Sequence, residues 1–230
     1  MRKLSTIVAL CMGIFIFSAC SSDDGEAPNA EYYNWKARND TYFEEVYKKA
    51  TEKIEAGDEK WYKIMSYAKN DADNHSNYII VNVLEQKEDG DYHAHKEVVN
   101  GTKNNNDGLM CPLVSDSCYI TYRGNMIPSK TYNTVATPDN INVGYQFDTK
   151  WFGNELIKEE AVMWGTTPGS LVEGFSTALQ YMHVGDRWRV YIPYRLGYGS
   201  NANGNIQAYS TLIFDIYMES FKTKQKPEKD

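Results

Sequence analysis

The sequence predicts a single α+β domain, in which a few antiparallel strands form a sheet and one amphipathic helix packs on one face of it. Three observations support this prediction. Short runs of alternating apolar side chains recur after residue 77, one well-formed amphipathic helix lies among them, and no internal repeat is present. A chain of 230 residues with 42% hydrophobic residues can bury one core and carry an extension, but hardly two full domains.

The strands are expected where apolar and polar residues alternate between turn-forming segments. The segments with this pattern are residues 78–84, 118–122, 144–147, 187–192 and 211–218. The helix is expected over residues 171–182, because its apolar residues recur at steps that place them on one face: Leu171, Phe175, Leu179 and Met182. The helix therefore has one apolar side with which to cover the sheet.

Residues 31–75 are predicted to form a helical extension that precedes the sheet. Apolar residues recur at three- and four-residue steps over residues 31–56, with lysine and glutamate between them. The run Asn39-Asp40-Thr41 is expected to divide this helix into two pieces, and Gly57 follows its end. Residues 61–68 are interpreted as one more helical turn or as a segment that docks on the domain.

The first twenty residues have the pattern of an export signal. Two basic residues precede an apolar run from Ile7 to Phe17, which is too short to span a bilayer, since that needs about 20 residues. Ser18 and Ala19 precede Cys20, as in the bacterial lipobox, in which the cysteine is lipidated. We therefore expect a signal peptide over residues 1–19, a lipid anchor at Cys20 and an acidic tether over residues 20–30. This places the chain in the bacterial cell envelope, on the outer membrane, either periplasmic or surface-facing.

Composition and charge exclude several classes of function. The 24 basic and 31 acidic residues give a net charge of −7, so nothing indicates the basic face that a nucleic-acid-binding protein needs. A mean hydropathy of −0.58 excludes a polytopic membrane protein. His93 and His95 are two residues apart, but no third ligand lies at a metal-binding spacing, so neither a metal nor another cofactor is expected.

Of the four cysteines, Cys11 lies in the predicted signal peptide and Cys20 is the predicted lipid anchor. The other two, Cys111 and Cys118, leave two interpretations open. In an oxidising compartment they could form a disulfide across the six residues between them. Alternatively, Cys118 begins an alternating strand and is a small buried hydrophobic residue there. A charged tail over residues 223–230 is expected to be frayed.

Aromatic residues and their neighbours succeed one another in an order that resembles a known family. The segments that carry the resemblance are Ile120-Thr121-Tyr122-Arg123-Gly124, Phe147-Asp148, Leu171-Val172-Glu173-Gly174-Phe175, Met182-His183-Val184-Gly185-Asp186, Gly197-Tyr198-Gly199 and Ser210-Thr211-Leu212-Ile213-Phe214-Asp215. Together they resemble the FKBP-type peptidyl-prolyl cis-trans isomerases. The resemblance runs from about Tyr78 to Phe221, which predicts an isomerase domain over residues 76–222.

The resemblance implies an FKBP-like fold and a set of site residues. In this family a twisted antiparallel sheet of about five strands wraps around one short helix and leaves an apolar pocket between them. The residues implied in catalysis are Asp148, Tyr198, Tyr122 and Phe214. Those implied in substrate binding are Phe147, Leu171, Val172, Phe175 and Ile206, with Phe175 as the floor of the pocket.

The function implied by the resemblance is rotation of X–Pro peptide bonds in proline-containing polypeptides of the cell envelope. The sequence departs from the family at the floor, where Phe175 replaces a tryptophan, and at Gln207-Ala208, where two prolines are usual. A further pocket aromatic is also missing from its usual position, for which Trp151, Phe152 or Trp164 could compensate. These departures keep a catalytically weak chaperone or binding lipoprotein as an alternative, and a glycan-binding protein as a lesser one. A homodimer formed through the helical extension is also left open.

Overall fold

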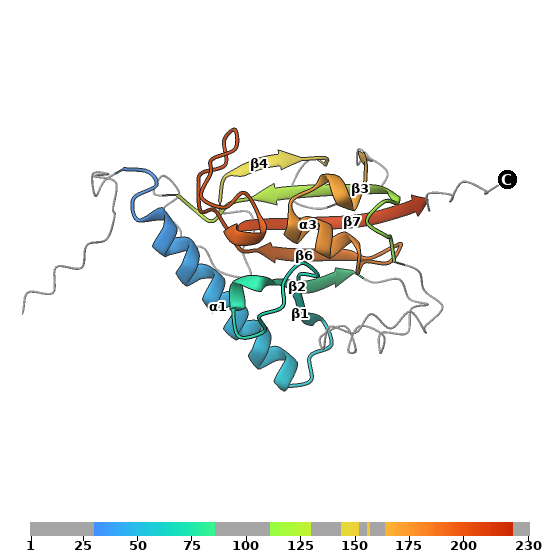
Figure 1. Cartoon of the computed structure of the whole chain (residues 1–230), viewed down its shortest axis with the longest axis horizontal. Coiled ribbons are helices and arrows are strands. Elements are labelled where there is room, and N and C mark those ends of the chain that lie inside the picture. Colours follow the sequence, from blue (N-terminus) through green and yellow to red (C-terminus); the bar gives the residue numbers. More distant parts are fainter. Residues whose placement is uncertain (1–29, 86–110, 130–143, 152–155, 157–163, 223–230) are drawn as a thin grey trace, which may run out of the picture.

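Every named strand in the described part of the chain belongs to one antiparallel sheet (Figure 1). The computed structural model describes residues 30–85, 111–129, 144–151, 156 and 164–222. The strands are β1 (Trp61–Met65), β2 (Tyr78–Glu85), β3 (Ser117–Asn125), β4 (Gln146–Thr149), β5 (Trp164–Thr166), β6 (Arg187–Ile192) and β7 (Leu212–Lys222). The helices are α1 (Trp35–Glu55), α3 (Glu173–Leu179) and three 3₁₀ turns, η1 (His75–Asn77), η4 (Pro168–Ser170) and η5 (Tyr194–Leu196).

The sheet is built around the long strands β3 and β7. Its order is β1-β2-β6-β7-β3-β4, and β5 pairs with β3 beside this path. The first residues of β3 pair with β5, as in Ile120↔Trp164, and its last residues pair with β4, as in Gly124↔Asp148. β3 therefore pairs with β7 along one side and with both β4 and β5 along the other.

The predicted α+β class, the antiparallel sheet and the N-terminal helix are confirmed, and each of the five expected strands is present. The structure adds β1 and β5 to the sheet. The interpretation of residues 61–68 as a further turn or docking segment was wrong, because β1 pairs with β2 from Trp61↔Asn82 to Met65↔Tyr78. The extension over residues 31–75 therefore contributes a strand as well as a helix.

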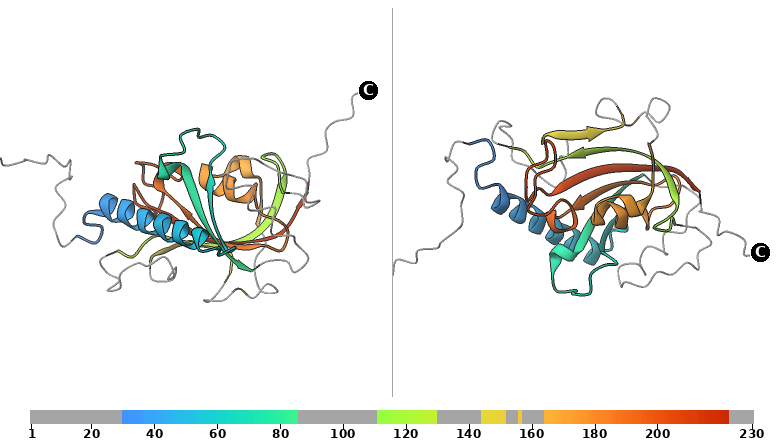
Figure 2. Two further views of the ribbon diagram at one scale, coloured as in Figure 1. Left: turned by 90° about the horizontal axis from the view of Figure 1, so that it is seen from below. Right: turned by 45° about the horizontal axis from the view of Figure 1, so that its top comes forward.

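The two helices lie on opposite faces of the sheet (Figure 2). α3 approaches β6 so closely that a Cβ on Gly174 would lie 2.3 Å from Cγ2 of Ile192. On the other side Tyr42 of α1 lies against Tyr191, with ring centroids 6.5 Å apart. Because neighbouring residues of a strand point to opposite faces, these two contacts place α3 and α1 on different sides. α3 is also shorter than the predicted helix, with Leu171 and Val172 preceding it and Met182 following it.

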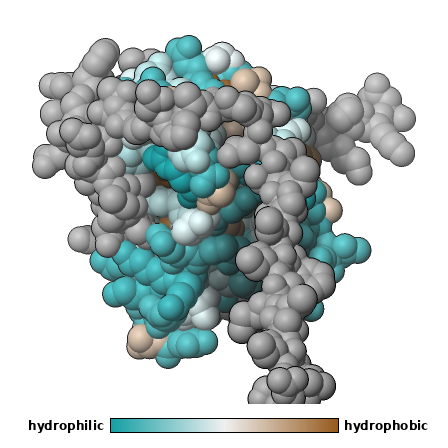
Figure 3. All heavy atoms as spheres, turned by 90° about the vertical axis from the view of Figure 1, so that its left-hand side faces the viewer, coloured by the Kyte–Doolittle hydropathy of each residue, from teal (hydrophilic) through white to brown (hydrophobic). Residues whose placement is uncertain are grey.

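The buried side of α1 packs against its own sheet rather than remaining available to a second copy. Its buried residues are Trp35, Asn39, Tyr42, Phe43, Val46 and Ala50. Where described residues are visible on the face of the molecule that carries the start of α1, they are mostly hydrophilic (Figure 3). A homodimer would therefore have to use a surface other than the apolar side of this helix.

Asn39 joins the extension to the domain, and α1 is unbroken there, contrary to the expected division of the helix. Its side-chain amide donates to the backbone oxygen of Trp35 at 2.8 Å, within the helix. Its Oδ1 accepts the backbone N–H of Thr211 at 2.7 Å, just before β7. The polar run that looked like a helix break is thus satisfied by a contact 172 residues away.

We expect Asn39→Ala to lower the free energy of unfolding by about 1–3 kcal/mol, since it leaves the buried N–H of Thr211 without its partner. Urea denaturation followed by circular dichroism would measure this loss. The matched control is Asn201→Ala, at an exposed position, which should leave the denaturation midpoint unchanged. Equal midpoints for the two variants would contradict the structural role given to Asn39.

Cys111 and Cys118 are both free in the structure, so the disulfide interpretation is not the one observed. Cys118 is fully buried in β3, as the strand interpretation expected. The predicted signal peptide, Cys20, the acidic tether up to residue 29, His93, His95 and the tail over residues 223–230 lie outside the described residues. Among the helices that the structure describes, none has the length and apolar character needed to cross a membrane.

Candidate active site

A pocket of about 580 Å³ lies between α3 and the sheet, within the size range of small-ligand sites. All nine pocket residues predicted from the sequence line it: Tyr122, Phe147, Asp148, Leu171, Val172, Phe175, Tyr198, Ile206 and Phe214. The lining also includes Trp164, Ser170, Asn203, Gly204 and Asn205. The predicted residues come from segments spread over more than ninety positions, and the fold brings them to one place.

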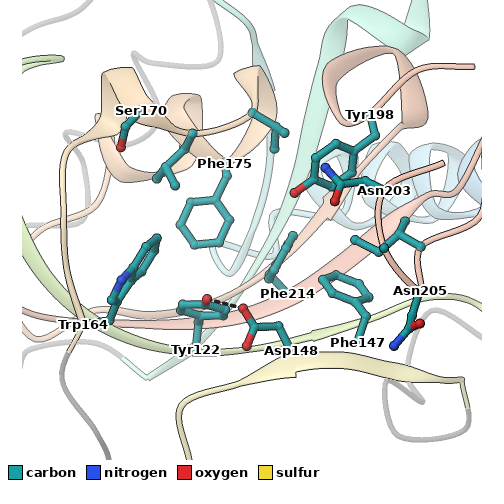
Figure 4. Close-up of a pocket in the computed structure, with 14 residues that line it drawn as sticks. Tyr122, Phe147, Asp148, Trp164, Ser170, Phe175, Tyr198, Asn203, Asn205 and Phe214 are labelled. Carbon is teal, nitrogen blue, oxygen red and sulfur yellow. Dashed lines mark hydrogen bonds between the residues drawn. The ribbon is translucent and has the colours of Figure 1, made fainter. Parts of the chain in front are cut away.

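Phe214 of β7 is the centre of the aromatic wall (Figure 4). Its ring centroid lies 4.8 Å from Phe175, 5.4 Å from Phe147 and 6.0 Å from Tyr122, and all three contacts are edge-to-face. Phe175 projects from α3 toward the sheet and is 4% exposed. Edge-to-face contacts of this kind hold rings in fixed positions, so the wall is rigid on the side where a substrate would rest.

Trp164 supplies the additional pocket aromatic for which the sequence offered three candidates. It lies on β5 and contacts Tyr122 edge-to-face, with ring centroids 5.4 Å apart. Trp151 is instead buried beneath the guanidinium groups of Arg123 and Arg187, 5.1 and 5.8 Å from its ring. Phe152 lies outside the described residues.

The polar groups of the pocket include Asp148 and the hydroxyls of Tyr122 and Tyr198. Tyr122 donates a hydrogen bond to Oδ2 of Asp148 at 2.5 Å, and the backbone N–H of Thr149 donates to Oδ1 at 2.8 Å. Burial and the neighbouring carboxylate both raise the pKa of Tyr122 well above its usual range, so its hydroxyl stays protonated and keeps donating. Tyr198 comes from the loop after η5 and directs its hydroxyl into the pocket (Figure 4).

The loop that precedes β7 forms the remaining wall through a tight turn. The backbone groups of Asn203 and Ile206 bond to each other in both directions at 2.9 Å. This turn places Ile206, which is 6% exposed, against the pocket. Asn205 donates from its amide to the hydroxyl of Tyr145 at 3.0 Å. Asn203 and Asn205 line the pocket beside Ile206, and neither asparagine was predicted from the sequence to do so.

The described residues contain no group of three or more histidine, cysteine, aspartate or glutamate side chains arranged to hold a metal ion. The pocket therefore offers rigid apolar walls, one carboxylate and hydroxyl donors. Such a site can bind an apolar ring and donate hydrogen bonds to a carbonyl oxygen.

Residues 131–219 match the family model described as FKBP-type peptidyl-prolyl cis-trans isomerase. The chain contains an FKBP-type domain. The chain is 31% identical over 116 residues to the macrophage infectivity potentiator of Trypanosoma cruzi, covering 50% of this chain and 48% of that protein. It is 43% identical over 71 residues to a probable FKBP-type 25 kDa peptidyl-prolyl cis-trans isomerase of Pseudomonas aeruginosa, covering 30% of this chain and 31% of that protein.

Among solved structures, the chain is similar to FkpA from Escherichia coli, with a TM-score of 0.49 and 19% identity over 82% of this chain and 62% of that one. The chain spans about half or less of the length of the curated relatives that it matches.

Proposed function

We propose that the FKBP-type domain catalyses cis–trans rotation of X–Pro bonds in polypeptides. The observation that carries this proposal is the convergence of four aromatic rings, the Tyr198 hydroxyl and the Asp148 carboxylate on one pocket. The family match over residues 131–219 supports it independently. We further propose that Cys20 anchors the protein to the cell envelope, which rests on the sequence of the first twenty residues.

The reaction needs no nucleophile, because no covalent bond is made or broken. Rotation about a peptide bond costs about 18–20 kcal/mol, since the twisted form loses the resonance of the planar amide. The uncatalysed X–Pro bond accordingly isomerises over tens to hundreds of seconds. A pocket that binds the twisted amide more strongly than the planar one lowers this barrier. The walls formed by Phe147, Phe175 and Phe214 favour the twisted form, which has lost much of its dipole.

The polar groups have separate roles in this proposal. The hydroxyl of Tyr198 would donate to the carbonyl oxygen of the substrate and hold one side of the bond while the proline ring turns. The carboxylate of Asp148 would lie beside the rotating amide, and its hydrogen bond from Tyr122 fixes its position. Because both groups are already in place in the folded protein, little reorganisation accompanies the rotation.

Removing either polar group should slow catalysis. We expect Tyr198→Phe and Asp148→Ala each to lower kcat/KM by about two- to ten-fold, which corresponds to one hydrogen bond worth about 0.5–1.5 kcal/mol. A protease-coupled assay on a peptide with an X–Pro bond measures this change. Tyr67→Phe is the matched control, since Tyr67 is 59% exposed and does not line the pocket.

A folded protein that gives no acceleration would contradict the isomerase proposal. The protein would then act by binding polypeptides without catalysing rotation. The presence of Phe175, where the family usually has the larger tryptophan, favours this alternative. Suppressed aggregation of a proline-free client would distinguish that alternative, because prolyl isomerisation cannot assist such a client.

A further inference from the structure

A cysteine, a histidine and an aspartate are gathered away from the pocket, in the segments that precede β3 and β6. The Sγ atom of Cys111 lies 3.3 Å from Nε2 of His183. On the other side of the ring, Nδ1 of His183 lies 3.6 Å from Oδ2 of Asp186. None of these three residues lines the pocket. The order thiol, imidazole, carboxylate is the one by which proteins activate a sulfur nucleophile.

The fold holds the histidine and aspartate firmly. Asp186 accepts the backbone N–H of His183 at 2.9 Å, and its own backbone N–H donates to the His183 oxygen at 3.1 Å. Gly185 and Asp186 exchange backbone hydrogen bonds with Met218 of β7 at 2.8 and 3.0 Å. Met218 is four residues beyond Phe214, which is roughly 13 Å along a strand. The cluster is therefore a second, separate site of the sheet.

The histidine is positively charged at neutral pH. Burial by itself would lower the pKa of His183, but hydrogen bonds to Asp186 and Cys111 outweigh it and raise this pKa to about 10. A protonated imidazole beside a sulfur atom stabilises the thiolate, which is the reactive form of cysteine. Among the described residues, Tyr181 interacts electrostatically with Cys111, and Tyr62 interacts with Asp186.

Cys118 has the opposite surroundings and serves as an internal comparison. It is fully buried in β3, whereas Cys111 is partly exposed. Burial, with a smaller contribution from Asp116, raises the pKa of Cys118 to about 11. A buried thiol of this kind is protonated and inaccessible, so the two cysteines should differ strongly in reactivity.

We propose that Cys111 is a nucleophile that forms a reversible mixed disulfide, with the imidazole of His183 beside its sulfur and Asp186 positioning that imidazole. The thiolate attacks one sulfur of a disulfide, a new S–S bond forms to Cys111, and the original S–S bond breaks. The departing sulfur leaves as a thiolate and takes up a proton from solvent. Cys111 is thereby oxidised and the departing sulfur reduced, so the exchange balances without another reactant.

The chemistry of this cluster favours a disulfide over a metal ion as its reaction partner. One thiolate and one imidazole do not complete the four-ligand set of a structural zinc site, and the described residues contain no larger group of ligands. Disulfide exchange needs only an accessible thiolate. The export predicted from residues 1–19 would place this thiolate where disulfides persist. The proposal does not depend on isomerase activity.

The test is to incubate the full chain with oxidised glutathione at pH 7 and to follow the adduct on each cysteine-containing peptide by mass spectrometry. We expect Cys111 to be modified at least ten-fold faster than Cys118, and dithiothreitol to reverse it. His183→Gln should slow the reaction at Cys111 at least ten-fold. His75→Gln, at an exposed histidine, should leave the rate unchanged. In a parallel reaction, a disulfide-linked peptide dimer replaces oxidised glutathione. Faster modification of Cys111 by the peptide dimer would identify a polypeptide as the source of the disulfide, and faster modification by glutathione would identify a small molecule.

A second measurement on the unaltered chain keeps the proposal falsifiable if His183→Gln does not fold. Iodoacetamide alkylates the thiolate form of cysteine, so an activated cysteine reacts faster than the same residue in an unfolded chain. At pH 7 we expect Cys111 in the folded chain to react at least ten-fold faster than Cys111 in the chain unfolded in urea. A ratio below three-fold would overturn the proposal.

Discussion

Replacing Asp215 with alanine is expected to lower the free energy of unfolding by about 3–5 kcal/mol. Asp215 is fully buried in β7, and three guanidinium groups surround its carboxylate. Nε of Arg189 lies 2.9 Å from Oδ1, while the nearest nitrogens of Arg123 and Arg187 lie 3.5 and 3.8 Å from Oδ2. Alanine would leave these cations close together without the anion that offsets their burial and mutual repulsion.

Urea denaturation of Asp215→Ala beside Asp71→Ala would measure the effect. Asp71 is exposed, so its substitution controls for the general loss of a carboxylate. Asp215→Asn keeps the shape of the side chain and removes only the charge, so it should recover little of the loss. A change below 1 kcal/mol for Asp215→Ala would contradict the view that this carboxylate holds β3, β6 and β7 together.

Alternation along β7 explains both what the sequence could predict here and what it could not. Leu212, Phe214 and Ile216 were expected on one face, and the structure places Phe214 in the pocket. Alternation along β7 does not show that the face carrying Asp215 is buried as well. The surroundings of Asp215 depend on its pairing with Arg123 of β3 and with Arg189 of β6. Such pairings follow from strand order, which a local pattern does not contain.

The pocket could be predicted because its residues follow an ordered succession along the chain. The choice among Trp151, Phe152 and Trp164 could not, because it depends on strand pairing. Trp164 enters the pocket because β5 pairs with β3 at Ile120. β5 has only three residues, too few for a period of two to be visible. Short edge strands of this kind are set by their neighbours rather than by their own composition.

The secondary structure of residues 61–65 was predicted incorrectly for a related reason. β1 has apolar side chains at Trp61, Tyr62 and Ile64, a short run that fits a strand or a helical turn equally well. Its pairing with β2 decides between them. Asn39 likewise favours a helix break when only its neighbours are considered, but its contact with Thr211 satisfies it within the helix. In both places tertiary contacts outweigh local preference.

Gly124→Ala is expected to lower kcat/KM of the proposed isomerase reaction by at least ten-fold while the protein still folds. A Cβ on Gly124 would lie 2.6 Å from the rings of Phe147 and Phe214, a distance at which both rings must move. Phe214 is already enclosed by Phe175 and Tyr122. Its displacement would therefore change the shape of the pocket wall, at a cost of about 1–3 kcal/mol in stability.

The matched control is Gly165→Ala on β5, where a Cβ would meet only the ring of Tyr119 at 3.6 Å, an ordinary contact. This variant adds the same methyl group next to Trp164, outside the aromatic wall, so its kcat/KM should remain within about two-fold of the unaltered protein, as expected for a substitution that creates no overlap. The protease-coupled assay and a thermal melt on both variants separate loss of activity from loss of fold. If Gly124→Ala folded and kept full activity, the rings of Phe147 and Phe214 would not be the surface that recognises the twisted bond, and the wall formed by Tyr122 and Trp164 would have to take that role.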